Sequence, residues 1–496
     1  MMRVVALCCA ITAAIGTTAF QRPALLSTRS SNSYYSLPAF PVHSSSLRKR
    51  HHEKRFSSTH NSASASNVHN DIKDEHRLEQ KTWLFQDKYP IAYEVASIAA
   101  SDNSDDVETV PILLLNGFGV GSFHQHRLMR QLLIEQQREK QQKRYTIYGI
   151  DYLGQGKSWP SNPQDGNSKD EYQLGYSADT WLDQLASFVQ EVILPPTTDI
   201  DSTTSTNSIN ICNKVHLVGN SVGGYLATIL TNRHPKLVSS LTLLNATPVW
   251  GLNLPGWDGK LPAPPIPKAI GRQMFDLIRN EDIIRQYLEA AYVRTEAFDG
   301  TYLDSFDDWG CIANDNDGTD GTPAVLGEGE PLGVKIRACT EGNGGHAAFA
   351  SILWSAPASG ISFYEALSQV PVDVLLLFGG DDPWCTQAVG KRMHVTLASR
   401  EKRRSDGDGG GSGVAASRFV TLENVGHCPN HEAPTAVAKV LMPWFNADDS
   451  KERSEIPLDS AAQVQEPWGE VLIREVPIEE SESLGLVDRV VSTMVG

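Results

Sequence analysis

The stretch Val215-His-Leu-Val-Gly-Asn-Ser-Val-Gly-Gly224 decides the fold, because it places a serine between a strand and a helix. A β-branched and aliphatic run ends at Gly219, and helix formers follow from Tyr225 until Pro235. A G-x-S-x-G match in this context predicts a nucleophile elbow, in which small neighbours let the serine occupy a strained turn. Ser221 is therefore the candidate nucleophile, and a structural turn serine is the alternative.

A candidate acid follows a second buried strand, Val372-Asp-Val-Leu-Leu-Leu-Phe-Gly-Gly-Asp-Asp-Pro-Trp384. A carboxylate at such a strand end can hold an imidazole in one tautomer and stabilise the imidazolium. Asp382 is the preferred acid, because a proline fixes the turn directly after it, and Asp381 is the fallback. The preceding strand, Leu241–Pro248, offers Asn245 and no carboxylate. The alternative is that both aspartates only cap a loop.

The candidate base is His427, in Phe419-Val-Thr-Leu-Glu-Asn-Val-Gly-His-Cys-Pro429. A strand leads to it, and a glycine before it lets the backbone turn. An imidazole titrates near neutrality, so it can take the serine proton and return it to a leaving alcohol. His431 lies beyond the proline in a polar segment, and we expect it to be a supporting or surface residue.

A glycine-rich loop after an early strand, Val110-Pro-Ile-Leu-Leu-Leu-Asn-Gly-Phe-Gly-Val-Gly121, is expected to complete the site. An oxyanion hole needs two backbone donors aimed at the developing negative charge. The N–H groups of Phe118 and Val222 are the candidates. Asn116 stands where many such enzymes carry histidine, which should change the hydrogen bonding of the loop. The loop lacks the spacing of nucleotide-binding motifs, so phosphate binding is not expected.

Aliphatic runs alternate with helical patterns along the chain. This alternation predicts an α/β fold, with a mostly parallel sheet flanked by helices. Helical spacing over Pro267–Arg294 and Ala347–Leu367 predicts a helical cap inserted before the last core strands. The predicted strands are Ile112–Leu115, Tyr145–Tyr152, Val215–Val218, Leu241–Leu244, Val374–Phe378 and Phe419–Leu422.

The expected organisation of the chain has six parts. Three internal inserts, at 197–208, 313–333 and 405–417, have the composition of disordered segments. The parts are a bipartite targeting leader (1–56), a linker (57–80), a first part of the core (81–248), the cap with its acidic insert (249–370), a second part of the core (371–447) and an acidic C-terminal tail (448–496).

Charge is distributed unevenly along the sequence. The chain has 43 basic and 59 acidic residues. The first 56 residues hold eight basic residues and one acidic residue, so the rest of the chain has 35 basic and 58 acidic residues and a formal net charge of −23. Such a negative body argues against nucleic acid as a partner. The leader joins an apolar signal-like run, 4–15, to a Ser/Arg-rich segment, 20–56. This predicts import into the stroma of a complex plastid; secretion with a basic propeptide is the alternative.

Several motifs together resemble the pheophytinase family of plastid α/β-hydrolases, over roughly residues 81–446 apart from the inserts. Val222 departs from the family's usual leucine, and the acidic insert in the cap puts substrate preference in doubt. The motifs are Gly117-Phe-Gly-Val-Gly-Ser-Phe-His124, Gly219-Asn-Ser-Val-Gly-Gly224, Leu243-Leu-Asn-Ala-Thr-Pro-Val-Trp-Gly251, Ala347-Ala-Phe-Ala-Ser-Ile352, Asp382-Pro-Trp384 and Gly426-His-Cys-Pro429.

The resemblance implies a serine esterase that cleaves the phytyl ester of pheophytin, with Ser221, Asp382 and His427 as its triad. It implies a hydrophobic phytylated tetrapyrrole as substrate, an apolar pocket and no cofactor or metal of its own; any magnesium would belong to the substrate. We expect no transmembrane span and at most loose association with thylakoids, and the oligomeric state stays open. Alternatives are a chlorophyll dephytylase, a plastid lipase or esterase, and a non-catalytic ligand carrier.

Overall fold

The computed structural model describes residues 76–98, 108–138, 143–160, 174–195, 213–301, 330–342, 344–405, 415–457 and 463–483. These residues all fall in one compact unit, Lys73–Gly496. The predicted leader (1–56), most of the predicted linker (57–80), the insert at 197–208 and most of the inserts at 313–333 and 405–417 lie outside the described residues.

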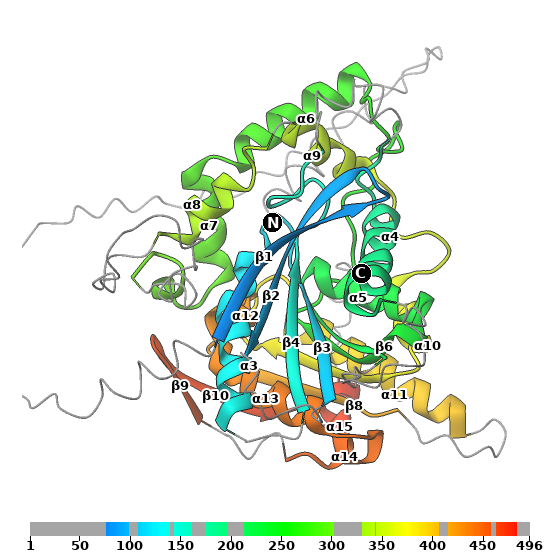
Figure 1. Ribbon diagram of the computed structural model, residues 1–496, viewed down its shortest axis with the longest axis vertical. Helices are drawn as coiled ribbons and strands as arrows, with labels where there is room; N and C mark the ends of the chain where they lie inside the picture. The colour runs from blue at the N-terminus through cyan, green and yellow to red at the C-terminus, as the bar shows by residue number, and fades with distance from the viewer. Residues whose placement is uncertain are drawn as a thin grey trace, which may run out of the picture. The chain divides into compact units, whose positions relative to one another are not determined.

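One sheet of ten strands organises the described chain, in the order β1-β2-β4-β3-β5-β6-β7-β8-β10-β9 (Figure 1). The six central strands are parallel to one another. They correspond to the six strands predicted from the sequence, and the predicted mostly parallel sheet is confirmed. Their bounds are β3 (Glu108–Leu115), β4 (Lys143–Ile150), β5 (Val215–Asn220), β6 (Val238–Leu244), β7 (Asp373–Gly379) and β8 (Ser417–Glu423).

Both edges of the sheet are antiparallel additions to the six predicted strands. β1 (His76–Phe85) and β2 (Tyr89–Ile98) form a hairpin beside β4, and β1 begins inside the range assigned to the linker. β10 (Gly469–Glu475) pairs with β8 and β9 (Gln463–Glu466), so part of the expected tail belongs to the sheet. Most residues of β1 are exposed, which explains why this strand has no continuous apolar run.

Neighbouring residues of the central strands face two separate apolar layers, because side chains alternate along a strand. Leu113 and Leu115 join one layer with α4 (Ala178–Phe188), α5 (Val222–Arg233), α10 (Phe363–Gln369) and α11 (Gln387–Ser405). Ile112 and Leu114 join the other layer with α3 (His126–Arg138) and α13 (Pro434–Asn446). Helices therefore cover both faces of the sheet, as predicted.

Helices inserted between β6 and β7 form the cap. The cap contains α6 (Pro265–Ile278), α7 (Glu281–Ala291), α8 (Leu332–Ala338) and α9 (Gly345–Trp354). Figure 1 shows α6 and α9 side by side, and Phe275 packs there against Phe349. The second predicted helical run is in fact two helices, since α10 packs on α5 and α11 in the layer over the sheet.

The remaining elements are short connections. Within the described ranges, no helix has both the length and the apolar character needed to cross a bilayer. The short elements are η1 (Ser122–Gln125), η2 (Val189–Ile193), η3 (Pro235–Leu237), η4 (Thr295–Ala297), α12 (Pro429–Glu432), α14 (Ser450–Glu455) and α15 (Ile478–Glu482).

Glu466, at the end of β9, gives the sheet edge a pH-dependent stability. Its side chain is buried and accepts hydrogen bonds from the Ala436 N–H and the Thr435 hydroxyl of α13, at 2.9 and 2.8 Å. Burial raises the pKa of Glu466 to about 7, against the opposing effect of these hydrogen bonds. The folded protein thus binds this proton more tightly than the unfolded chain, whose glutamate has a pKa of 4.5. As the pH rises from about 4.5 to about 7, ionisation of this carboxyl therefore lowers the free energy of unfolding.

We expect Glu466→Gln to become more stable than the wild type as the pH rises, because the amide never ionises. The difference in the free energy of unfolding should grow by up to about 3 kcal/mol between pH 4.5 and pH 7. Urea unfolding at several pH values measures this difference in the free energy of unfolding. Glu455→Gln makes the same substitution at an exposed position and is the control. Stability curves that run parallel to the wild type would contradict the prediction.

Candidate active site

The predicted elbow is a strand–turn–helix unit in the structure. β5 ends at Asn220, α5 begins at Val222, and Ser221 between them has φ 54° and ψ −119°. This is a conformation that side-chain-bearing residues rarely adopt. Ser221 is the N-cap of α5, yet its side chain makes no capping hydrogen bond. Its hydroxyl is therefore left available for chemistry.

Close backbone packing explains the glycines around the serine. A Cβ atom on Gly219 would collide with the carbonyl oxygen of Gly223. A Cβ atom on Gly223 would in turn collide with the carbonyl oxygen of Leu115, at the end of β3. The motif therefore lets the turn lie directly against the loop that follows β3.

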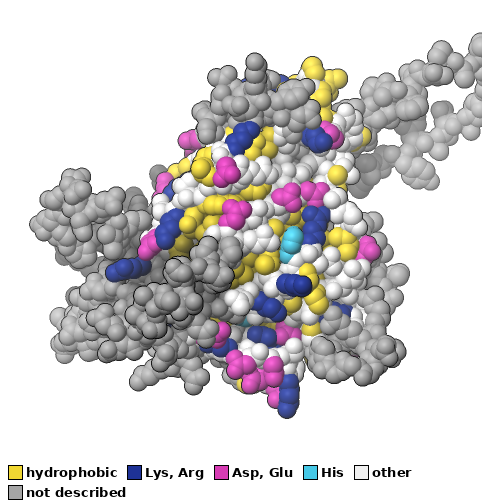
Figure 2. Space-filling model, turned by 45° about the vertical axis from the view of Figure 1, so that its right-hand side comes forward, with side chains coloured by type: hydrophobic (Ala, Val, Ile, Leu, Met, Phe, Trp, Pro, Cys, Tyr) yellow, Lys and Arg dark blue, Asp and Glu magenta, His cyan; other side chains and the backbone are white. Residues whose placement is uncertain are grey.

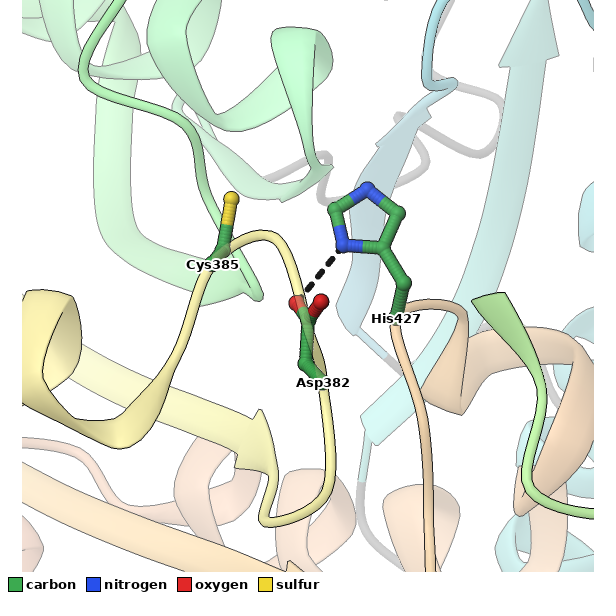
Figure 3. Close-up of side chains that lie close together, drawn as sticks. All are labelled: Asp382, Cys385 and His427. Atoms are coloured by element: carbon green, nitrogen blue, oxygen red, sulfur yellow. Dashed lines mark hydrogen bonds and ion pairs between the residues drawn. The ribbon is translucent and has the colours of Figure 1, made fainter. Parts of the chain in front are cut away.

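The structure brings Asp382 and His427 together. Nδ1 of His427 lies 2.7 Å from Oδ2 of Asp382, and both side chains are buried (Figure 3). Burial alone would raise the pKa of Asp382. The charge and hydrogen bond of His427 outweigh this effect, together with hydrogen bonds from the N–H groups of Trp384 and Cys385, and the pKa of Asp382 lies below its usual value. The fallback Asp381 is exposed and accepts instead from the Asn424 N–H at 2.9 Å.

A hydrogen bond ties the elbow to the loop of the histidine in this pair. The side chain of Asn220 donates to the carbonyl oxygen of His427 at 3.0 Å, so the residue before Ser221 is bonded to the base. It also donates to the carbonyl oxygen of Leu244 at 3.1 Å, which ties β5, β6 and the loop after β8 to one point. Three distant segments of sequence therefore meet at the carboxyl ends of the sheet.

Asn245 contacts the candidate acid, a role that the sequence did not indicate. Its Nδ2 donates to Oδ2 of Asp382 at 2.8 Å, and its Oδ1 accepts from the Gly379 N–H at 2.7 Å. Asn245 has φ 41°, a strained value that the surrounding hydrogen bonds stabilise. It cannot serve as the acid, but it orients the acid from the neighbouring strand. The only sequence signal was its place at the end of a buried strand.

The loop after β3 lies against the elbow. A Cβ atom on Gly117 would lie 3.5 Å from Cβ of Ser221. Gly119 has φ 82°, which favours glycine, and its N–H is occupied by Oε1 of Gln155 at 2.7 Å. Because the Gly119 N–H is already bonded, the N–H of the preceding residue, Phe118, stays the predicted donor from this loop. Val222, the other candidate donor, begins α5 directly after Ser221.

A buried aspartate anchors the far end of this loop. Asp151 accepts from the Ser122 N–H at 2.6 Å and from the Lys157 N–H at 2.7 Å. Burial raises the pKa of Asp151 to about 6, although these hydrogen bonds act in the opposite direction. Asn116, at the start of the loop, donates to the carbonyl oxygen of Ile150 at 3.0 Å.

Aromatic side chains connect this loop to the cap. Phe118 is 41% exposed, and its ring centroid lies 6.3 Å from that of Phe349 on α9. Phe349 is in turn 5.6 Å from Phe275 on α6. An apolar wall therefore runs from the candidate oxyanion loop into the cap. Figure 2 shows further apolar side chains exposed among charged ones on the face it presents.

Asp382, Cys385 and His427 place potential metal-ligand atoms within 4.8 Å of one another (Figure 3). Both oxygens of Asp382 and Nδ1 of His427 already take part in hydrogen bonds. Burial holds the pKa of Cys385 well above its usual value, so its thiol stays protonated, whereas metals bind the thiolate. These donors suit an acid–base pair better than a metal site.

Cysteine and histidine neighbours of the pair have packing roles. Cys339, Cys385 and Cys428 are free thiols, and Cys212 and Cys311 lie outside the described residues. His431, expected as a supporting or surface residue, is buried and stacks on His124 with ring centroids 4.9 Å apart.

Comparison with known proteins shows the family of this chain. Residues 112–440 match the model of the alpha/beta hydrolase family. The chloroplastic pheophytinase of Arabidopsis thaliana is 27% identical over 418 residues, which cover 79% of this chain and 71% of that protein. The predicted resemblance to pheophytinase is thereby confirmed.

Two solved esterases share the architecture at low sequence identity. An esterase from Exiguobacterium antarcticum is 16% identical, with a TM-score of 0.45 over 74% of this chain and 100% of the esterase. A thermophilic esterase from Thermogutta terrifontis is also 16% identical, with a TM-score of 0.42 over 74% of this chain and 98% of that one. The match to the family model spans well over half of the sequence. The chain belongs to the alpha/beta hydrolase family.

Proposed function

We propose that this hydrolase is a serine carboxylic-ester hydrolase that cleaves the phytyl ester of pheophytin. The observation that carries the chemistry is the 2.7 Å bond between Asp382 and His427, whose loop is tied through Asn220 to the strained elbow of Ser221. In such a constellation the acid orients the base, and the base activates the serine. Pheophytin is the proposed substrate because of the resemblance to pheophytinase.

The reaction proceeds in two steps. Ser221 attacks the ester carbonyl while Nε2 of His427 takes its proton, and the N–H groups of Phe118 and Val222 stabilise the oxyanion. His427 then gives the proton to the departing phytol, which leaves an acyl-enzyme. Water, deprotonated by His427, attacks this acyl group and releases the free acid with the serine restored.

The aromatic wall formed by Phe118, Phe349 and Phe275 supports an apolar substrate. Phe118 is exposed on the candidate oxyanion loop and is backed by the buried rings of Phe349 and Phe275, so an apolar group attached to the ester could pack on it. A large, flat macrocycle gains from stacking on aromatic side chains. The same wall would also accept the acyl chain of a lipid, which makes a lipase or esterase the second candidate.

We place the protein in the plastid. The Arabidopsis thaliana relative is a chloroplastic protein by name, and the first 56 residues have the composition of a signal followed by a transit peptide. A plastid location would give the enzyme access to pigment esters. A fluorescent fusion of the full chain, compared with one lacking residues 1–56, tests this placement.

Purified protein incubated with pheophytin, chlorophyll and a galactolipid tests the substrate. We expect phytol release from pheophytin, slower release from chlorophyll and no release of fatty acid from the galactolipid. Faster release from chlorophyll would identify a chlorophyll dephytylase instead. Fatty-acid release alone would identify a lipase, and binding without any product would indicate a ligand carrier.

A further inference from the structure

A second buried carboxylate lies five residues beyond the candidate base. Glu432, at the end of α12, is fully buried. Its Oε2 accepts from the Gly426 N–H at 2.7 Å, directly before His427. Its Oε1 accepts from the N–H groups of Val293 and Arg294, each at 2.9 Å. One side chain therefore bonds the loop of the base to the segment of the cap that follows α7.

The same cap segment also contacts the backbone of the base directly. The His427 N–H donates to the carbonyl oxygen of Ala291, the last residue of α7, at 2.7 Å. A Cβ atom on Gly426 would collide with that carbonyl oxygen, so the two backbones are in close contact. The position of His427 is therefore set partly by the cap and not only by β8.

A tyrosine of the cap segment adds a connection to the opposite side of the site. The Tyr292 hydroxyl lies 2.9 Å from Nε2 of His124 and 3.2 Å from Nδ1 of His431. His124 belongs to η1, which directly follows the loop of Phe118. The cap segment 291–294 thus joins the base loop and the continuation of the candidate oxyanion loop.

The cost of burying Glu432 indicates that its position is specific. Burial raises the pKa of Glu432 to about 7, while the three backbone hydrogen bonds and the charge of Arg294 oppose that rise. The other ionisable groups that face it, Tyr292 and Cys428, are uncharged because burial raises the pKa of each. A buried carboxyl with such sparse charge compensation is retained only where its hydrogen bonds are needed.

We propose that Glu432 is a positioning residue, which holds the loop of His427 on cap segment 291–294 and so couples the cap to the catalytic base. This proposal rests on the proposed role of His427 as general base. Glu432 touches neither the substrate nor the reacting atoms and acts only through the backbone at Gly426. A shift of the cap segment would therefore move the imidazole relative to Ser221.

Glu432→Gln tests the proposal with little change in size. The amide offers one acceptor oxygen in place of two, so its NH₂ group must face either the Gly426 N–H or the two N–H groups of the cap. We expect the rate of Ser221 labelling by a fluorophosphonate, and kcat for pheophytin, to fall about 10- to 100-fold, with KM nearly unchanged. The labelling rate depends on the base but not on the identity of the pigment.

Glu466→Gln is the matched control. Glu466 is also a buried glutamate with a pKa raised to about 7 and a backbone N–H as donor, but its contacts are in α13. We expect its labelling rate to equal that of the wild type. The proposal would be overturned if both variants were labelled at the wild-type rate. It would also be overturned if the labelling rates of both variants fell to the same reduced value.

A second variant approaches the same connection from the cap. The partly exposed side chain of Arg294 donates to the carbonyl oxygens of Asn424 and Glu470, at 2.7 and 2.5 Å. Arg294→Ala leaves Glu432 intact and should lower the labelling rate several-fold at unchanged KM. If Glu432→Gln does not fold, Arg294→Ala takes its place as the test. A wild-type labelling rate for Arg294→Ala would then overturn the proposal. Absence of labelling in the wild type would instead refute the proposed function.

Discussion

Ser221→Ala should abolish ester hydrolysis, with kcat reduced by roughly a million-fold, because no other group of the site can form the acyl-enzyme. The variant should also lose all labelling by a fluorophosphonate. Phytol release followed by chromatography measures the first effect, and labelled protein on a gel measures the second. Residual turnover at a tenth of the wild-type rate would show that Ser221 is not the nucleophile.

This loss should occur without unfolding. Alanine keeps the Cβ atom that makes the φ of 54° strained, so the backbone conformation at the elbow costs about the same in both proteins. The serine side chain makes no capping hydrogen bond to α5, and its removal therefore leaves the helix end unchanged. We expect the free energy of unfolding to change by less than about 0.5 kcal/mol. Ser454→Ala, on exposed α14, serves as the activity control.

Asp382→Asn should lower kcat about ten-thousand-fold, although the side chains have nearly the same shape. Oδ2 of Asp382 accepts from both His427 and Asn245, and Oδ1 accepts from the Trp384 N–H. An asparagine must turn its NH₂ group toward one of these sets of donors. If it faces the ring, His427 is forced into the tautomer that cannot take the serine proton; otherwise the Trp384 N–H loses its acceptor.

Asp381→Asn provides a matched control in the adjacent position. It makes the same change of charge, but Asp381 is exposed and its side chain accepts from the Asn424 N–H rather than from the histidine. We expect its kcat to stay within about twofold of the wild type, as for most surface substitutions. A larger loss from Asp381→Asn than from Asp382→Asn would reverse the assignment of the acid. Rates of phytol release from both variants, measured in parallel, decide between them.

Much of the central fold could be predicted because its signals are local. Most of the buried parallel strands are short aliphatic runs, and most are followed by a glycine-containing turn that needs little context to identify. The same strands end next to Ser221, Asp382 and His427, and strands of one parallel sheet end at one edge. The contact between the acid and the base therefore follows from topology.

Other parts depend on contacts that a sequence does not display. Glu432 and Asn245 have roles only because segments far apart in the chain meet beside them. The hairpin of β1 and β2 has many exposed polar residues, since one of its strands has only a single neighbour in the sheet. Polar strands of this kind resemble linkers in composition. β9 and β10 lie in a segment whose acidic residues favour assignment to a tail, although Val471 and Ile473 of β10 belong to the core.

The pairing of β10 with β8 has a consequence for any shortened form of the protein. β8 carries Val420 and Leu422, both fully buried, and its outer edge is covered only by β10 among the described strands. A chain cut after Asn446 would keep every residue of the family match but leave this apolar edge open to pairing with other molecules. The final strands thus protect the protein against aggregation.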